Sequence, residues 1–143
     1  MSEYTIKRVS GTTYFGTNTV DISDGNWLIN GVAPSATQTA IPQITTASSY
    51  TFVSGDAGKH LYYTTSTTAT ITIPANSSVA YATGTILNIA SGSGAGQLTI
   101  TCGDTLLFAN QGFTGTRYLS APGLATALKV ASTTWIISGA GLS

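Results

Sequence analysis

Short runs of alternating hydrophobic and polar residues follow one another along most of the chain, each closed by a turn signal. Thr70-Ile71-Thr72-Ile73 and Leu98-Thr99-Ile100-Thr101 are the clearest. A period of two predicts strands, with Ile71, Ile73, Leu98 and Ile100 on a dry inner face. From Ser48 onward such runs recur about every ten residues. We predict strands at Tyr50–Val53, Leu61–Thr64, Ala69–Ile73, Thr85–Ala90, Gln97–Thr101, Leu106–Phe108, Arg117–Leu119, Ala127–Val130 and Trp135–Ser138.

Many short strands separated by regular turns predict an all-β fold. We expect a single antiparallel β-sandwich, jelly-roll-like, with an extended N-terminal arm, because the dry face of one sheet needs a second sheet to cover it. The best candidate for a helical turn is Pro122–Leu128, which is too short to count as a helix.

The first 45 residues have a different pattern from the rest. Residues 1–45 are predicted to form an arm of short strands that ends in a proline-containing linker, and residues 46–143 to form the β-sandwich knob. The linker is Ala33–Ile44, where two prolines favour extended backbone. The strand candidates of the arm are Tyr4–Val9, Thr12–Phe15, Val20–Ile22 and Trp27–Val32.

Charge is scarce in this chain. Five acidic and five basic residues make up 7% of the 143 positions and cancel to zero, against about 25% in an average domain. The remainder is rich in hydroxyls and glycine, with 26 Thr, 16 Ser and 16 Gly. The missing basic run argues against nucleic acid as a partner. No apolar run approaches the roughly 20 residues of a membrane-spanning helix, and no signal peptide is recognisable.

Candidates for catalysis are few and each has a structural interpretation. His60 is the only histidine and lies at a turn-to-strand junction, where a surface or cross-strand role is favoured. Asp56 and Asp104, the only acids in the second part, lie in predicted turns, where Asp commonly bonds its own backbone. We therefore expect no enzyme and no catalytic residue.

Ligand-binding patterns are equally weak. Asp21 and Asp24 offer fewer carboxylates than a calcium loop uses. The glycine-rich Ser91–Gly96 precedes a predicted strand, whereas a phosphate loop precedes a helix. Cys102 is expected to be a buried small hydrophobic residue. We expect no metal and no cofactor. Threonine pairs raise the possibility of an ice-binding face, but they share no common period.

Several segments resemble a β module that is widespread in tailed-phage and prophage virion proteins. The resemblance begins at Ser49–Leu61 and Ala69–Asn76, where Gly55, Asp56, Gly58 and Pro74 form turns, and it closes around Trp135. It continues through Gly84–Ile89, Gly94–Ile100, Ala127–Val130 and Thr134–Gly139. Gly25–Val32 is also similar to segments that join phage fibre modules.

The resemblance implies a homotrimeric structural protein on the outside of a phage particle: a capsid decoration (cement) protein, a head fibre or a tail-fibre domain. Because the chain starts with Met and ends after the last predicted strand, we expect a complete small protein, which favours decoration. It would be made in the host cytoplasm and would sit on the outer surface of the capsid in the virion. Neither nucleic acid nor membrane is an expected partner.

The arm is the predicted anchor to the major capsid protein, because it is too small to be a domain yet rich in apolar residues. The proposed anchoring residues are Tyr4, Ile6, Val9, Tyr14, Phe15 and Trp27. An arm that packs back on its own sandwich is the structural alternative. The functional alternative is a tail-fibre or head-fibre adhesin that stacks a host cell-surface glycan on Tyr62, Tyr63 or Tyr118.

Overall fold

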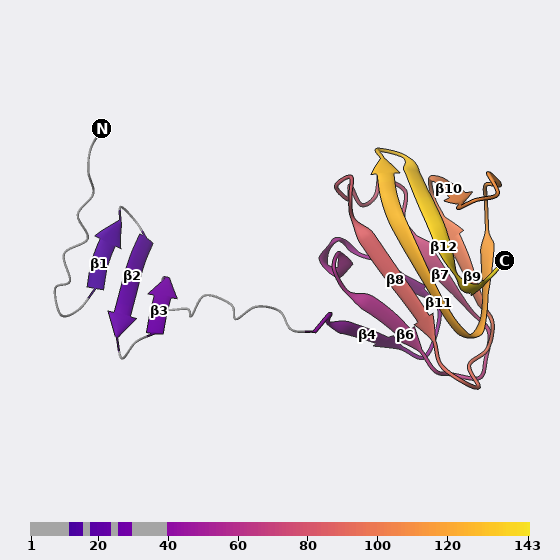
Figure 1. Cartoon of the computed structure of the whole chain (residues 1–143), viewed down its shortest axis with the longest axis horizontal. Coiled ribbons are helices and arrows are strands. Elements are labelled where there is room, and N and C mark those ends of the chain that lie inside the picture. Colours follow the sequence, from indigo (N-terminus) through magenta and orange to yellow (C-terminus); the bar gives the residue numbers. More distant parts are fainter. Residues whose placement is uncertain (1–11, 16–17, 24–25, 30–39) are drawn as a thin grey trace. The chain divides into compact units, whose positions relative to one another are not determined.

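The computed structural model describes residues 12–15, 18–23, 26–29 and 40–143. The chain divides into two compact units, Met1–Ala40 and Ile41–Ser143. In the first unit, β1 (Thr12–Phe15), β2 (Asn18–Ser23) and β3 (Asn26–Ile29) form an antiparallel sheet in that order (Figure 1). These strands coincide with or overlap three of the predicted runs, and the run Tyr4–Val9 lies outside the described residues.

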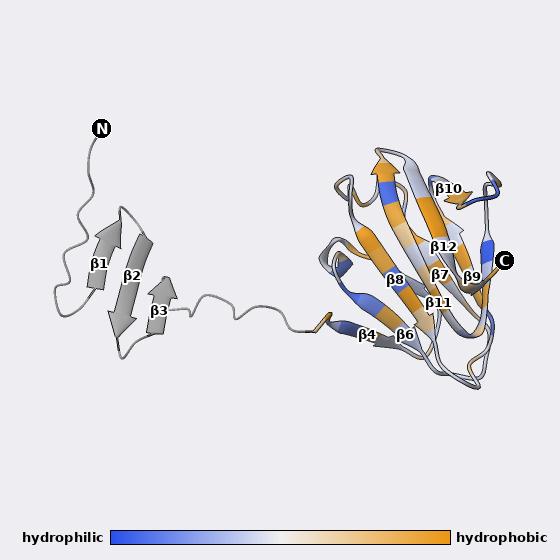
Figure 2. Ribbon diagram, in the orientation of Figure 1, coloured by the Kyte–Doolittle hydropathy of each residue, from blue (hydrophilic) through white to orange (hydrophobic). Residues whose placement is uncertain are grey.

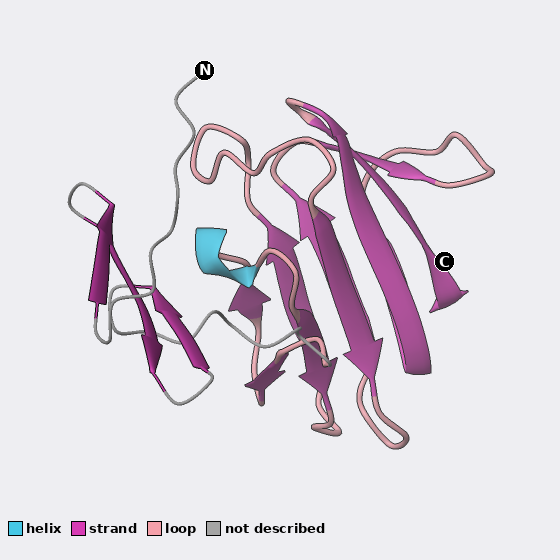
Figure 3. Cartoon of the chain, turned by 60° about the vertical axis from the view of Figure 1, so that its left-hand side comes forward, coloured by secondary structure: helices cyan, strands magenta, loops and turns pink. Residues whose placement is uncertain are grey.

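The second unit is built from nine strands and one short 3₁₀ turn, η1, which is the cyan element in Figure 3. The elements are β4 (Gln43–Thr46), β5 (Tyr50–Thr51), η1 (Ser54–Asp56), β6 (His60–Tyr63), β7 (Ala69–Ile73), β8 (Ile86–Ser91), β9 (Leu98–Cys102), β10 (Thr105–Phe108), β11 (Arg117–Ala131) and β12 (Thr134–Leu142). The predicted arm ended at Thr45, whereas β4 pairs with β6 and is part of this second sheet.

The chain winds as a flattened coil from β4 to β9. It alternates between two parallel sets of strands, β4-β6-β8 on one side and β5-β7-β9 on the other. The register places Ile44, Leu61 and Ile89 side by side across the first set. Each turn of the coil therefore stacks its inward apolar residues on those of the preceding turn.

The long strand β11 joins the two sides. Its first residues, Arg117–Leu119, pair with β9, and residues 123–128 pair with β8, with a register shift between Leu119 and Leu124. The resulting strand order, β4-β6-β8-β11-β9-β7-β5, is a nearly closed barrel-like sheet. Strand β12 pairs antiparallel with β11 and parallel with β10.

The all-β prediction is confirmed, but the antiparallel arrangement is wrong for this unit. Five of its strand pairings are parallel and three are antiparallel. The coil is the physical reason, because strands one turn apart run in the same direction. The strand order does not confirm a jelly-roll-like sandwich. Pro122–Leu128, the helical-turn candidate, lies within β11.

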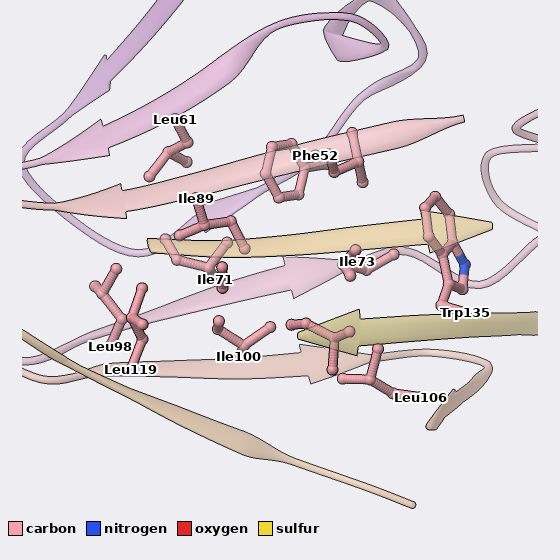
Figure 4. Close-up of a cluster of buried hydrophobic side chains, with 14 of the residues drawn as sticks. Phe52, Leu61, Ile71, Ile73, Ile89, Leu98, Ile100, Leu106, Leu119 and Trp135 are labelled. Atoms are coloured by element: carbon pink, nitrogen blue, oxygen red, sulfur yellow. The ribbon is translucent and has the colours of Figure 1, made fainter. Parts of the chain in front are cut away.

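The core lies between the two sides of the barrel-like sheet (Figure 4). The prediction that Ile71, Ile73, Leu98 and Ile100 point inward is confirmed, since all four are fully buried. Burying one such side chain contributes about 1.5–3 kcal/mol. Trp135 on β12 is the largest fully buried side chain, and its ring meets the Tyr81 ring edge-on at 5.7 Å between centroids.

Candidate functional site

The first candidate is the turn around Asp56, which carries the glycine-aspartate motif. The Asp56 side chain is buried, with the residue only 3% exposed. Its Oδ2 accepts hydrogen bonds from the Tyr50 hydroxyl and the Val53 backbone N–H, both at 2.9 Å, and its Oδ1 lies 3.6 Å from Lys59 Nζ. The carboxylate is therefore used to hold the turn together, as the turn interpretation predicted.

The rest of this motif is also structural. Gly58 has a φ of +78°, a left-handed conformation that favours glycine. Gly55 lies in η1 beside Asp56, with open space where a side chain would project. Burial raises the pKa of the Tyr50 hydroxyl, and its hydrogen bond to Asp56 raises it further. Burial and the Asp56 charge raise the pKa of Tyr81 to about 12.

Pro74 and Trp135, the other motif residues, line a second polar cluster. Pro74 is buried directly after β7, and the following segment brings Asn76 to Lys129. Lys129 is 1% exposed, and its Nζ donates to Asn76 Oδ1 at 2.6 Å. Trp135 Nε1 is buried without a hydrogen-bond partner. The sequence interpretation did not single out Lys129, although it shares the inward alternation of Ala125 and Ala127.

The remaining chemical candidates take part in local contacts. Asp104 Oδ2 accepts from the Asn76 backbone N–H at 2.7 Å, so Asp104 and Asp56 belong to different clusters. His60 Nε2 lies 3.2 Å from Gln43 Oε1, a cross-strand contact of the kind predicted. Cys102 is a free, half-buried thiol that packs against the core, and burial raises its pKa.

A hydroxyl face covers the outside of β5, β7 and β9. Thr51, Thr72 and Thr101 are in register across the three strands, and the Thr72 and Thr101 hydroxyls are 3.1 Å apart. Thr70 and Thr99 form a second pair two residues away. The sequence shows no common period because these threonines come from different turns of the coil and are aligned only by the parallel register.

An apolar face covers the outside of β8, β11 and β12, where Figure 2 shows orange stretches along all three strands. Ile86, Leu128 and Ile136 are cross-strand neighbours on this face. Ile86 and Leu128 are exposed, as are Val130 and Leu124, the last at 53%. We call these five residues the outer apolar face. Water solvates such a cluster poorly, and clusters of this kind are often found where proteins bind partners.

A polar row separates the two ends of this face. His60, Asn88, Thr126 and Ser138 are aligned across four strands, and the Thr126 hydroxyl donates to Asn88 Oδ1 at 2.8 Å. The row carries an imidazole, an amide and two hydroxyl groups but no carboxylate, guanidinium or ammonium. A partner that covers this sheet would bury few charges, which lowers the cost of desolvation.

The proposed capsid-anchoring residues belong to the first unit. Tyr14 and Phe15 lie in β1 and Trp27 lies in β3, opposite Ile22 of β2. Tyr4, Ile6 and Val9 lie outside the described residues. The anchoring role of this set stays a prediction. Of the proposed glycan-stacking residues, Tyr118 is 45% exposed and Tyr62 is half-buried, but Tyr63 is fully buried and cannot serve as a platform.

Within residues 12–15, 18–23, 26–29 and 40–143, no three His, Cys, Asp or Glu side chains gather as a metal site would require. No helix in that part of the chain is long and apolar enough to cross a membrane. No protein-family model matches the sequence, and no curated protein matches it.

Proposed function

We propose that this chain is a non-enzymatic structural protein of a tailed-phage virion. In this proposal it is a homotrimeric decoration (cement) protein, which binds the outer surface of the major capsid shell through its first unit and stabilises the head. The resemblance of the sequence to phage β modules suggests that the protein is part of a virion. The observation that carries the proposal is the outer apolar face, because a charge-poor sheet with several exposed large side chains suits repeated protein–protein contact.

The division of the chain into two units supports separate roles, with the first unit as the anchor and the second as the knob. The second unit has its own core, drawn entirely from residues 52–137, so it can act as a knob without the first unit. The first unit contributes a small three-stranded sheet and the aromatic residues predicted to anchor it. Removing residues 1–40 should leave a folded knob that no longer binds capsids, whereas full capsid binding by that truncated chain would contradict the anchoring role.

The trimer has a direct test in sedimentation of the purified protein. We expect a mass three times the 14.6 kDa of one chain. Leu128→Asp, on the outer apolar face, should lower the mass to that of a monomer, and the matched control Thr101→Asp, on the hydroxyl face, should not. A monomer mass for the unaltered protein would overturn the trimer. Electron microscopy of intact virions then locates the protein, with many copies over the head expected for decoration.

A glycan-binding adhesin is the second candidate, and one observation favours it. Tyr118 is exposed and lies in register with Thr99 at the margin of the hydroxyl face, so an aromatic ring adjoins a set of hydroxyl groups. Such a surface can stack a sugar ring and hydrogen-bond its hydroxyls. A glycan array probed with the full chain and with Tyr118→Ala tests this, and density at the tail instead of the head would support it.

A further inference from the structure

The contact between the buried Lys129 and the half-buried Asn76 is an unusual use of a lysine. Lys129 is almost completely buried, and the only ion pair among the described residues joins Lys59 to Asp56. An ammonium removed from water normally requires a carboxylate partner, because burying an unpaired charge is costly. Here the amine instead meets the side-chain amide of Asn76, with 2.6 Å between Nζ and Oδ1.

The surroundings hold the two groups against each other. Lys129 extends inward from β11, with its backbone bonded to Gly84 and Thr85, and its Nζ lies 5.6 Å from the centre of the Trp135 ring. Asn76 is fixed from the other side, because its backbone N–H donates to Asp104 at 2.7 Å. The buried amine and the half-buried amide are thus positioned by separate elements, which is the arrangement that favours a reaction between them.

We propose that Lys129 and Asn76 react to form an intramolecular isopeptide bond. In its neutral form, after Nζ has given one proton to solvent, the Lys129 amine attacks the side-chain carbonyl carbon of Asn76, so a bond forms between Nζ and Cγ. The bond between Cγ and Nδ2 breaks, and ammonia leaves with the second proton that Nζ gives up. One amide replaces another, nothing is oxidised or reduced, and no co-reactant is needed.

Asp104 is the positioning residue in this proposal. Its Oδ2 accepts a hydrogen bond from the Asn76 backbone N–H at 2.7 Å, and Lys129 Nζ donates to the side chain of the same residue. Asp104 and Lys129 therefore contact the same asparagine. Fixing the Asn76 backbone keeps its amide in line with the amine.

The bond would join two distant parts of the fold. Asn76 follows β7, and Lys129 is near the end of β11, the strand that connects the two sides of the barrel-like sheet. A covalent tie between them would hold the closing strand to the coil even when the surrounding hydrogen bonds open. The inference rests on these contacts alone and does not depend on a capsid role.

Intact-mass spectrometry of the purified full-length protein tests the proposal. The expected mass is lower than the sequence mass by one ammonia, and proteolysis should release a branched peptide that contains both Asn76 and Lys129. Lys129→Met and Asn76→Ala should each restore the full mass expected for their sequences. An unmodified mass for the natural sequence would overturn the proposal, and it does so whether or not the two variants fold.

A side reaction of asparagine must be told apart from the isopeptide bond. Asparagine can lose ammonia alone by forming a succinimide, so loss of ammonia that persists in Lys129→Met would overturn the isopeptide bond.

Two variants of Asp104 test its positioning role. Asp104→Asn keeps an acceptor for the Asn76 N–H and should form the bond fully, whereas Asp104→Ala removes the acceptor and should leave a fraction of the protein at unmodified mass. Equal modification in both variants would overturn the positioning role of Asp104.

Discussion

Replacing Asp56 by alanine should destabilise the knob by about 2–3 kcal/mol. The change removes a buried acceptor that serves the Tyr50 hydroxyl and the Val53 N–H, each at 2.9 Å. Tyr50 is half-buried and Val53 is exposed, so water can reach part of both donors. We therefore assign about 1 kcal/mol to each lost hydrogen bond and at most about 1 more to the loss of the charge that organises the turn.

Two matched variants divide this effect into its parts. Asp56→Asn keeps the shape and one acceptor oxygen, so it should cost about 1 kcal/mol. Lys59→Ala removes only the 3.6 Å ion pair, whose lysine side chain is 38% exposed, and should cost less than about 1 kcal/mol. The expected order of destabilisation is Asp56→Ala, then Asp56→Asn, then Lys59→Ala.

Urea unfolding of residues 41–143 measures these differences. Trp135 is the only tryptophan in that part of the chain and is fully buried, so its fluorescence reports the loss of the core. With a slope of about 1–3 kcal/mol per molar urea, the midpoint for Asp56→Ala should fall by roughly 0.7–3 M. A Lys59→Ala variant as unstable as Asp56→Ala would refute the reasoning, because the turn would then depend on the ion pair and not on the hydrogen bonds.

The same unfolding assay tests three further expectations. Ile71→Ala should cost about 3 kcal/mol because Ile71 is fully buried, whereas Thr72→Ala on the outer face should cost at most about 1; equal losses would contradict the assigned faces. The pKa of Tyr81 is raised from 10.0 to about 12, so the folded state holds this proton more tightly, and stability should fall by up to about 2–3 kcal/mol as pH rises from 10 through 12. Tyr81→Phe should reduce that alkaline slope, and an unchanged slope would exclude Tyr81 as its source. Gly139→Ala should cost at least about 2 kcal/mol, because its new Cβ would lie 2.1 Å from the Leu124 carbonyl oxygen, while Gly55→Ala meets open space and should change stability by less than about 0.5 kcal/mol.

Local pattern was enough to predict most strands but not their pairing. Ala69–Ile73 coincides with β7, and the alternation there correctly assigned the inward residues. The parallel sets could not be predicted, because pairing between β4, β6 and β8 depends on how the chain returns after each turn of the coil. Two predicted strands, Arg117–Leu119 and Ala127–Val130, are parts of the single strand β11, which also includes the helical-turn candidate Pro122–Leu128.

Among the candidate sites, contacts between residues close in sequence could be predicted, and contacts between distant residues could not. The turn role of Asp56 follows from neighbours close in sequence, and it was predicted. The contact between Lys129 and Asn76 joins residues 53 positions apart, and no short sequence motif indicates it. The adhesin alternative required Tyr63 to be accessible, but its inward position on β6 buries the ring, and its hydroxyl donates to the Thr67 carbonyl at 2.8 Å.

The late position of β11 in the chain affects how the protein folds while it is being synthesised. Strands β8 and β9 each have one neighbour, β6 and β7, and gain a second only when β11 arrives. One edge of each strand therefore stays open while the ribosome makes the 29 residues between the end of β9 at Cys102 and the end of β11 at Ala131. At about 5–20 residues per second, this interval lasts roughly 1.5 to 6 seconds. A nascent chain that ends before Arg117 would leave one edge of β8 and one edge of β9 without a partner strand, and these edges could pair with another such chain. Slower elongation or crowded polysomes should therefore increase aggregation before the folded protein is ever released.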